Sequence, residues 1–138
     1  MSALTIVRRF LQASLSDDPE KWRLKTKAFH AAQHQFTKHR RFRAFDLHWR
    51  DMRDGFAEIQ ATLGESEALQ VVATVYYGPW DTTDDSRLEG AVEVDPRYRR
   101  QGLATALYDW AEALTGLKFA PASSHTSDAE AFWRARRR

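Results

Sequence analysis

The stretch Val92-Glu-Val-Asp-Pro-Arg-Tyr-Arg-Arg-Gln-Gly-Leu-Ala-Thr105 decides the fold, because it changes from strand to helix across an arginine-rich turn. Leu88 to Val94, which leads into it, has the pattern of a strand. After the turn, Leu103, Leu107, Trp110 and Leu114 fall on one helical stripe, and Gly116 ends the helix. The stretch therefore predicts a strand, a turn and an amphipathic helix in succession.

This turn has the features of an anion-binding site. The N–H groups in the first turn of a helix have no partners within the helix, and the helix dipole places about half a positive charge there. Gly102 lets a ligand come close to the backbone, and Ala104 keeps the next position small. Arg99 and Arg100 add two full positive charges, so we expect the turn to accept a diphosphate. An ordinary arginine-rich surface turn is the alternative.

The same residues resemble the pyrophosphate-binding signature of the GNAT superfamily of N-acyltransferases: Arg or Gln, two residues, Gly, one residue, then Gly or Ala. Arg99-Arg-Gln-Gly102-Leu-Ala104 satisfies it, and Val94-Asp-Pro96-Arg-Tyr98-Arg99 is similar to the family's usual lead-in. The resemblance implies that acetyl-CoA is the co-substrate and that Val92 and Val94 offer backbone groups to its pantetheine. It also implies that the pyrophosphate is held by Arg99, Arg100, Gln101, Gly102, Leu103 and Ala104, assisted by Thr105.

The catalytic proton carriers are less clearly marked. GNAT proteins often place a tyrosine, which protonates the departing thiolate, where Ala129-Glu-Ala-Phe132-Trp133 ends in tryptophan, and an indole cannot act as a general acid. The candidates are therefore His125, in the loop before that segment, and Glu93, which shares a strand face with Glu89. The alternatives are an exposed loop histidine and glutamates that only pair with arginine. Because the family usually adds a final hairpin, the resemblance also implies a chain that is short at its C-terminus.

The composition of the chain limits the kinds of fold and site that it can form. A chain of 138 residues with 43% hydrophobic residues fits one globular domain, which we expect over residues 1–138 with an α/β (α+β) fold and a mainly antiparallel sheet. With no cysteine, disulfides, thiolate zinc sites and cysteine nucleophiles are excluded. His30 and His34 stand four apart, but no zinc pattern follows, so we expect no metal. No run of about 20 apolar residues and no secretory signal is present, which favours a cytoplasmic protein without a membrane contact.

The rest of the chain predicts further helices and strands around the coenzyme-binding helix, which follows the third clear strand. In chain order we expect helices at residues 3–14 and 19–36, a short strand or irregular bridge from Arg41 to Arg53, a half-buried strand from Phe56 to Leu63, a turn from Gly64 to Glu67, a strand from Leu69 to Tyr77 paired with the previous one, a loop from Gly78 to Arg87, a short strand from Leu117 to Ala120 and a last helix from Ser127 to Arg136.

Two functions follow from these features. The first is an N-acetyltransferase that transfers an acetyl group from acetyl-CoA to a primary amine of a small molecule, a protein or an aminoacyl or nucleic-acid acceptor. The second, a nucleic-acid-binding protein on the same fold without standard acetyl transfer, is suggested by the basic and aromatic residues from Lys38 to Arg53. A solvated basic face over packed aromatic rings explains that segment equally simply. The sequence does not indicate the oligomeric state.

Overall fold

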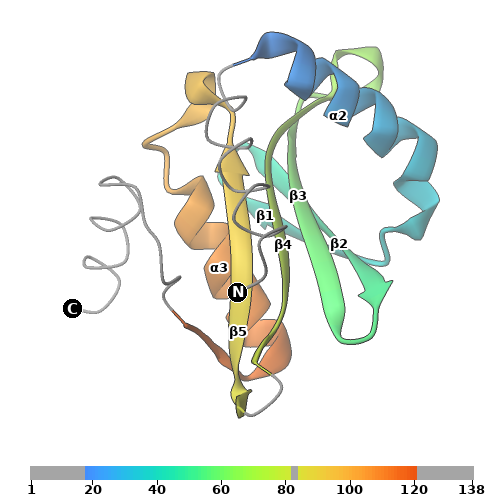
Figure 1. Cartoon of the computed structure of the whole chain (residues 1–138). Coiled ribbons are helices and arrows are strands. Elements are labelled where there is room, and N and C mark those ends of the chain that lie inside the picture. The colour runs from blue at the N-terminus through green and yellow to red at the C-terminus, as the bar shows by residue number, and fades with distance from the viewer. Residues whose placement is uncertain (1–17, 82–83, 121–138) are drawn as a thin grey trace.

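The computed structural model describes residues 18–81 and 84–120, which form a curled six-stranded sheet with helices on its faces (Figure 1). The strands lie in chain order, and only the last pair, β5 and β6, is parallel. The elements are α2 (Pro19–Ala32), η1 (Gln33–Gln35), β1 (Lys38–Phe42), β2 (Phe45–Arg53), β3 (Phe56–Leu63), η2 (Ser66–Ala68), β4 (Gln70–Asp81), β5 (Asp84–Val94), η3 (Pro96–Tyr98), α3 (Leu103–Thr115) and β6 (Lys118–Phe119). The predicted α+β class with a mainly antiparallel sheet is confirmed.

Both helices begin and end where local chemistry favours it. The Asp18 carboxylate caps α2 by accepting a hydrogen bond from the Glu20 N–H at 2.9 Å, and Pro19 occupies the first helical position. Helix α3 ends at Gly116, whose φ of +73° suits glycine and whose N–H donates to the Glu112 carbonyl at 2.8 Å. The predicted start of α2 and the predicted stop of α3 are confirmed, whereas α2 ends at Ala32, before the predicted residue 36, and a 3₁₀ turn follows it.

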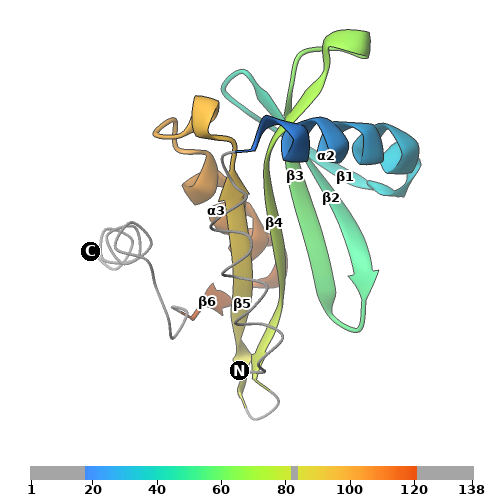
Figure 2. The ribbon, with the colours of Figure 1, turned by 45° about the horizontal axis from the view of Figure 1, so that its top comes forward.

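The two helices cover opposite faces of the sheet (Figure 2). Leu103 and Leu107 of α3 pack into the main core with Ile59 and Val75, whereas Trp22 and Phe29 of α2 form a second cluster. Strand β3 is consequently buried on both faces, and the prediction that it is half-buried is wrong. Its polar side chains include Gln60 and Thr62, which are 7% and 0% exposed.

The segment predicted as a short strand or irregular bridge is instead the greater part of a hairpin. Strands β1 and β2 pair antiparallel from Lys38 opposite Trp49 to Phe42 opposite Phe45. The turn between them uses Arg43 at a φ of +54°, a conformation that glycine or asparagine normally signals. Because neither residue is present in that turn, no sequence signal predicts it. Helix α3 therefore follows the fifth strand and not the third.

The loop predicted from Gly78 to Arg87 is also wrong, because β4 and β5 continue through most of it. Pro79 pairs with Leu88, and Asp81 pairs with Asp84. Position 78 requires glycine, because the Phe56 ring occupies the space in which any other residue would place its Cβ. Proline has no N–H to donate to a neighbouring strand. Pro79 lies beyond Tyr77, the last β4 residue that pairs with β3, so the pairing of these two strands loses no hydrogen bond there.

Three predicted features lie outside the described residues: the helix at 3–14, the last helix from Ser127 and the loop that holds His125. In the described ranges, no helix combines the length and the apolar character that a membrane crossing requires. Within those ranges, no three histidine, aspartate or glutamate side chains gather closely enough to hold a metal ion.

Candidate functional site

The turn between β5 and α3 is fixed at its start by Asp95, which is 2% exposed. Its N–H donates to the Val72 carbonyl of β4 at 2.8 Å. Its carboxylate accepts hydrogen bonds from the Arg97 backbone at 3.0 Å and from the Arg97 guanidinium at 3.2 and 2.8 Å. The Tyr98 N–H donates to the Asp95 carbonyl at 2.8 Å. Asp95 therefore sets the direction in which the chain leaves the sheet.

The second part of the turn has two residues in the left-handed region. Arg100 has a φ of +62°, and Gly102, the N-cap of α3, has a φ of +80°. The Gly102 carbonyl accepts the first helical bond, from the Ala106 N–H at 2.9 Å. No side chain in the described part of the chain caps this end. The amides of the first turn therefore have no acceptor within the helix, as an anion site requires.

The predicted pyrophosphate residues differ in what they can offer. Arg99, Arg100, Gln101 and Thr105 are exposed, and Ala104 is partly buried. The Leu103 side chain is 2% exposed and belongs to the core, so only its backbone can face a ligand. The structure thus brings all six signature positions and Thr105 together in one turn and the first turn of α3.

The edge of β5 next to this turn is only partly covered. Strand β6 pairs with Arg87 and Leu88 alone, and the Ala120 N–H donates to the Leu88 carbonyl at 2.8 Å. Backbone groups alternate along a strand, so those of Val92 and Val94 point to the same side as those of Leu88. Beyond Leu88, no strand of the described residues pairs with this edge.

The side chains of these β5 residues alternate between the two faces of the sheet. Val92 and Val94 pack against the core beneath α3, while Glu93 lies on the α2 face. There it forms an ion pair with Lys21, and the Nζ atom of Lys25 lies 4.0 Å from the same Oε2 atom. The Glu93 side chain is 9% exposed. Neither lysine was singled out in the sequence, because α2 precedes β5 by some 60 residues and no motif links them.

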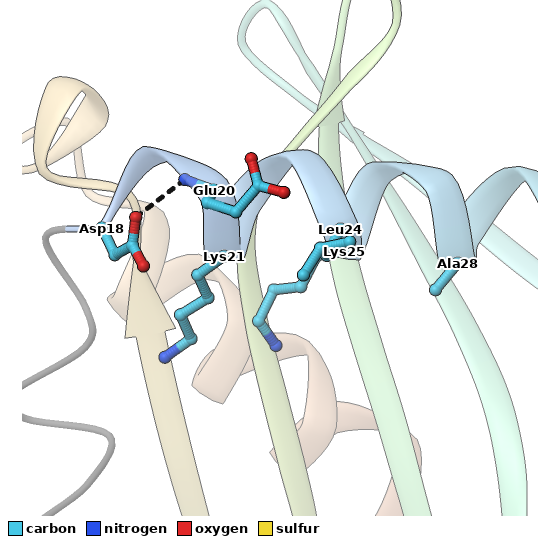
Figure 3. Close-up of a pocket in the computed structure, with 6 residues that line it drawn as sticks. All are labelled: Asp18, Glu20, Lys21, Leu24, Lys25 and Ala28. Carbon is cyan, nitrogen blue, oxygen red and sulfur yellow. Dashed lines mark hydrogen bonds between the residues drawn. The ribbon is translucent and has the colours of Figure 1, made fainter.

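A shallow hollow runs along α2 beside this ion pair. Figure 3 shows Lys21 and Lys25 extending from the helix toward the sheet at its lower side. The hollow has a volume of about 450 Å³. Its lining residues are Asp18, Glu20, Lys21, Leu24, Lys25 and Ala28. The structure therefore places a carboxylate of β5 and two ammonium groups of α2 next to an accessible concave surface.

The predicted basic and aromatic segment lies on the β1–β2 hairpin. Lys38 has its Nζ atom 4.2 Å from the centre of the Trp49 ring, and Arg50 pairs with Glu58 at 2.9 Å. Arg40 and Arg41 are exposed on β1. Arg41 also pairs with Asp46 at 3.0 Å, so ring and carboxylate partners hold much of the charge of this hairpin.

One contact at the site joins residues far apart in the chain. The Nη1 atom of Arg43, in the β1–β2 turn, donates to the Gln101 carbonyl at 3.0 Å. No local pattern predicts this contact, since 58 residues separate the two positions.

The comparison with known proteins agrees with this geometry. The family model described as Acetyltransferase (GNAT) family matches residues 19–132, a range that includes both α-helices and all six strands of the described residues. No curated protein and no solved structure gave a significant match. The match covers far more than half of the 138-residue chain and includes the turn that carries the signature. The chain therefore belongs to the GNAT acetyltransferase family.

Proposed function

We propose that the protein is an N-acetyltransferase that transfers the acetyl group of acetyl-CoA to a primary amine. The observation that carries the proposal is the N-terminus of α3, which no side chain of the described residues caps, with Arg99 and Arg100 beside it. It follows a strand whose edge, among the described residues, pairs with another strand only at Arg87 and Leu88. In this arrangement the diphosphate accepts hydrogen bonds from the amides of Leu103 to Thr105. The pantetheine arm lies along β5 and bonds to the backbone of Val92 and Val94.

In the proposed reaction the amine nitrogen attacks the thioester carbonyl carbon. The N–H beside Val94 stabilises the negative oxygen that forms, the C–S bond breaks, and the coenzyme leaves as a thiolate that takes up a proton. The attacking amine must lose a proton, and Glu93 is the proposed acceptor, directly or through water. His125, outside the described residues, is the second candidate for proton transfer.

The position of Glu93 suggests the side from which the acceptor arrives. Its backbone lies between Val92 and Val94, but its side chain faces α2, where it pairs with Lys21, one of the residues that line the hollow. The donor and the acceptor would thus reach the thioester from different sides of β5. This separation supports direct transfer within a ternary complex, in which positioning supplies much of the rate.

Calorimetric titration with acetyl-CoA tests the donor, and release of free thiol across a panel of primary amines tests the reaction. We expect saturable binding that Gly102→Glu abolishes, because the new carboxylate would repel the diphosphate. Gly116→Glu is the matched control, since Gly116 has a similar φ at the other end of α3. Absence of binding to any acyl-CoA would reject the proposal.

A second candidate is nucleic-acid binding through the β1–β2 hairpin, supported by the exposed Lys38, Arg40 and Arg41. Contacts to phosphates release counterions, so affinity for single-stranded or duplex probes should fall steeply as the salt concentration rises. A combined activity, with the amine carried on a nucleic acid or its aminoacyl group, would show this salt dependence together with thiol release. Thiol release with small amines and no affinity for nucleic acid would exclude both.

A further inference from the structure

The turn of the β1–β2 hairpin packs directly against the signature turn. Arg43 donates its Nη1 hydrogen to the Gln101 carbonyl at 3.0 Å. The Phe42 ring lies beneath Gly102, with its Cζ atom 3.5 Å from the position of a Cβ on that glycine. The rings of Phe45 and Tyr98 pack edge to face, with their centres 6.3 Å apart. A distant hairpin therefore supports the turn on which the coenzyme is proposed to bind.

The Arg43 side chain is itself held in place. The Nε atom of Arg41 donates to the Arg43 carbonyl at 3.0 Å, and the Arg43 guanidinium lies 5.2 Å from the centre of the Phe42 ring. Arg43 also has a φ of +54°, which L-residues with a long side chain rarely adopt. Glycine would suit the backbone better, so the arginine is not explained by the conformation of the hairpin.

The hydrogen bond from Arg43 has a consequence for the neighbouring amide. A trans peptide is planar, with its carbonyl oxygen and its N–H on opposite sides. Holding the Gln101 carbonyl toward Arg43 therefore directs the Gly102 N–H away from it. The same bond also keeps the partly negative Gln101 oxygen against the Arg43 guanidinium. That oxygen therefore does not face an incoming phosphate, which it would repel.

We infer that Arg43 is a positioning residue for the coenzyme: it holds the Arg99–Gly102 turn in its binding conformation before the diphosphate arrives. The inference rests on the proposed function. A turn that is already ordered loses less conformational entropy when the ligand binds, so affinity should depend on Arg43. The maximal rate should not, because Arg43 contacts the turn and not the atoms that react.

The test compares Arg43→Gly with Arg53→Gly. Both positions are exposed arginines in hairpin turns at positive φ, +54° and +76°, but Arg53 lies at the opposite end of β2. Each substitution removes one charge and relieves the strain of a positive φ, which offsets part of the entropy that glycine adds to the unfolded chain. Thermal unfolding verifies that both variants are folded under the conditions of the titration. We expect Arg43→Gly to weaken binding of acetyl-CoA about tenfold by calorimetry and to raise its KM similarly, with kcat within twofold of the parent. Arg53→Gly should change each value less than twofold.

Further measurements separate positioning from simple charge. Arg43→Lys keeps the charge but not the planar fork, and we expect it to recover only part of the affinity. The difference between the parent and Arg43→Gly should persist at 0.5 M salt, whereas long-range attraction would be screened. Equal affinities of the two glycine variants, or a difference that disappears in salt, would overturn the inference. Failure of the parent protein itself to bind acetyl-CoA would instead reject the proposed function.

Discussion

Lys21 of α2 and Glu93 of β5 form an ion pair whose side chains are only 17% and 9% exposed, so opposite charges join the helix to the sheet beneath it. Removing one partner leaves the other charge in a poorly hydrated place. We expect Lys21→Met to lower the free energy of unfolding by about 2 kcal/mol in a urea titration. Lys21→Met combined with Glu93→Gln should recover much of that loss. A double variant that is no more stable than Lys21→Met would contradict this expectation.

Glu93→Gln also tests the proposed proton acceptor. The amide keeps the size of the side chain but cannot take up the amine proton, and loss of a general base typically lowers the rate about 10²- to 10⁴-fold. We expect kcat to fall within that range while the affinity for acetyl-CoA is retained. Glu89→Gln, a neighbour on the same strand face, is the control and should retain most of the activity. A kcat for Glu93→Gln close to that of the parent would exclude the role.

Gly102 and Gly116 provide a matched pair at the two ends of α3. Both have positive φ, +80° and +73°, and a Cβ on Gly102 would meet its nearest neighbour only at ordinary contact distance. Alanine should therefore lower the stability by about 1 kcal/mol at each position through backbone strain alone. Only Gly102→Ala should weaken the binding of acetyl-CoA, because its strain is relieved within the turn that we propose binds the diphosphate. Thermal unfolding and calorimetry measure the two effects separately.

The cross-strand contact between His39 and His48 should make stability depend on pH. Their Nδ1 atoms are 2.9 Å apart, and the Nε2 atom of His48 lies 2.8 Å from the Thr62 hydroxyl. Burial, and then the nearby His39, lower the pKa of His48 below its ordinary value of 6.5, although Asp46 acts in the opposite direction. The unfolded chain therefore takes up a proton at a higher pH than the folded protein does.

The stability that neutral His48 contributes is consequently complete above pH 6.5 and is lost as the pH falls through its lowered pKa. We expect the free energy of unfolding to decrease between pH 8 and pH 5, and His48→Gln to reduce that decrease. Urea titrations at the two pH values measure it. An unchanged pH dependence in His48→Gln would contradict the assignment to this residue.

The sequence predicted the elements whose signals are local. The start of α2 at Pro19, the stop of α3 at Gly116 and the apolar stripe of α3 each depend on a few neighbouring residues, so their positions could be predicted closely. The signature turn was predictable for the same reason. The turn at Arg43 was missed because its backbone conformation contradicts the usual preference of arginine.

Contacts across the sheet could not be predicted from one sequence. The burial of Thr62 on the second face of β3 depends on where α2 lies, and the partner of Glu93 depends on the same packing. The contact of Arg43 with Gln101 depends on how the hairpin and α3 meet over the core. The separation along the chain removes any local signal for these three relationships.

Strand β1 is the outermost strand on its side of the described sheet, and it carries Lys38, Arg40 and Arg41. The outer strand of a sheet presents unpaired amides and carbonyls on which another chain can polymerise. Two copies that met edge to edge here would bring their cations together, and the repulsion would disfavour such growth. We therefore expect the positive charge of this strand to oppose aggregation, whether or not it ever meets a phosphate.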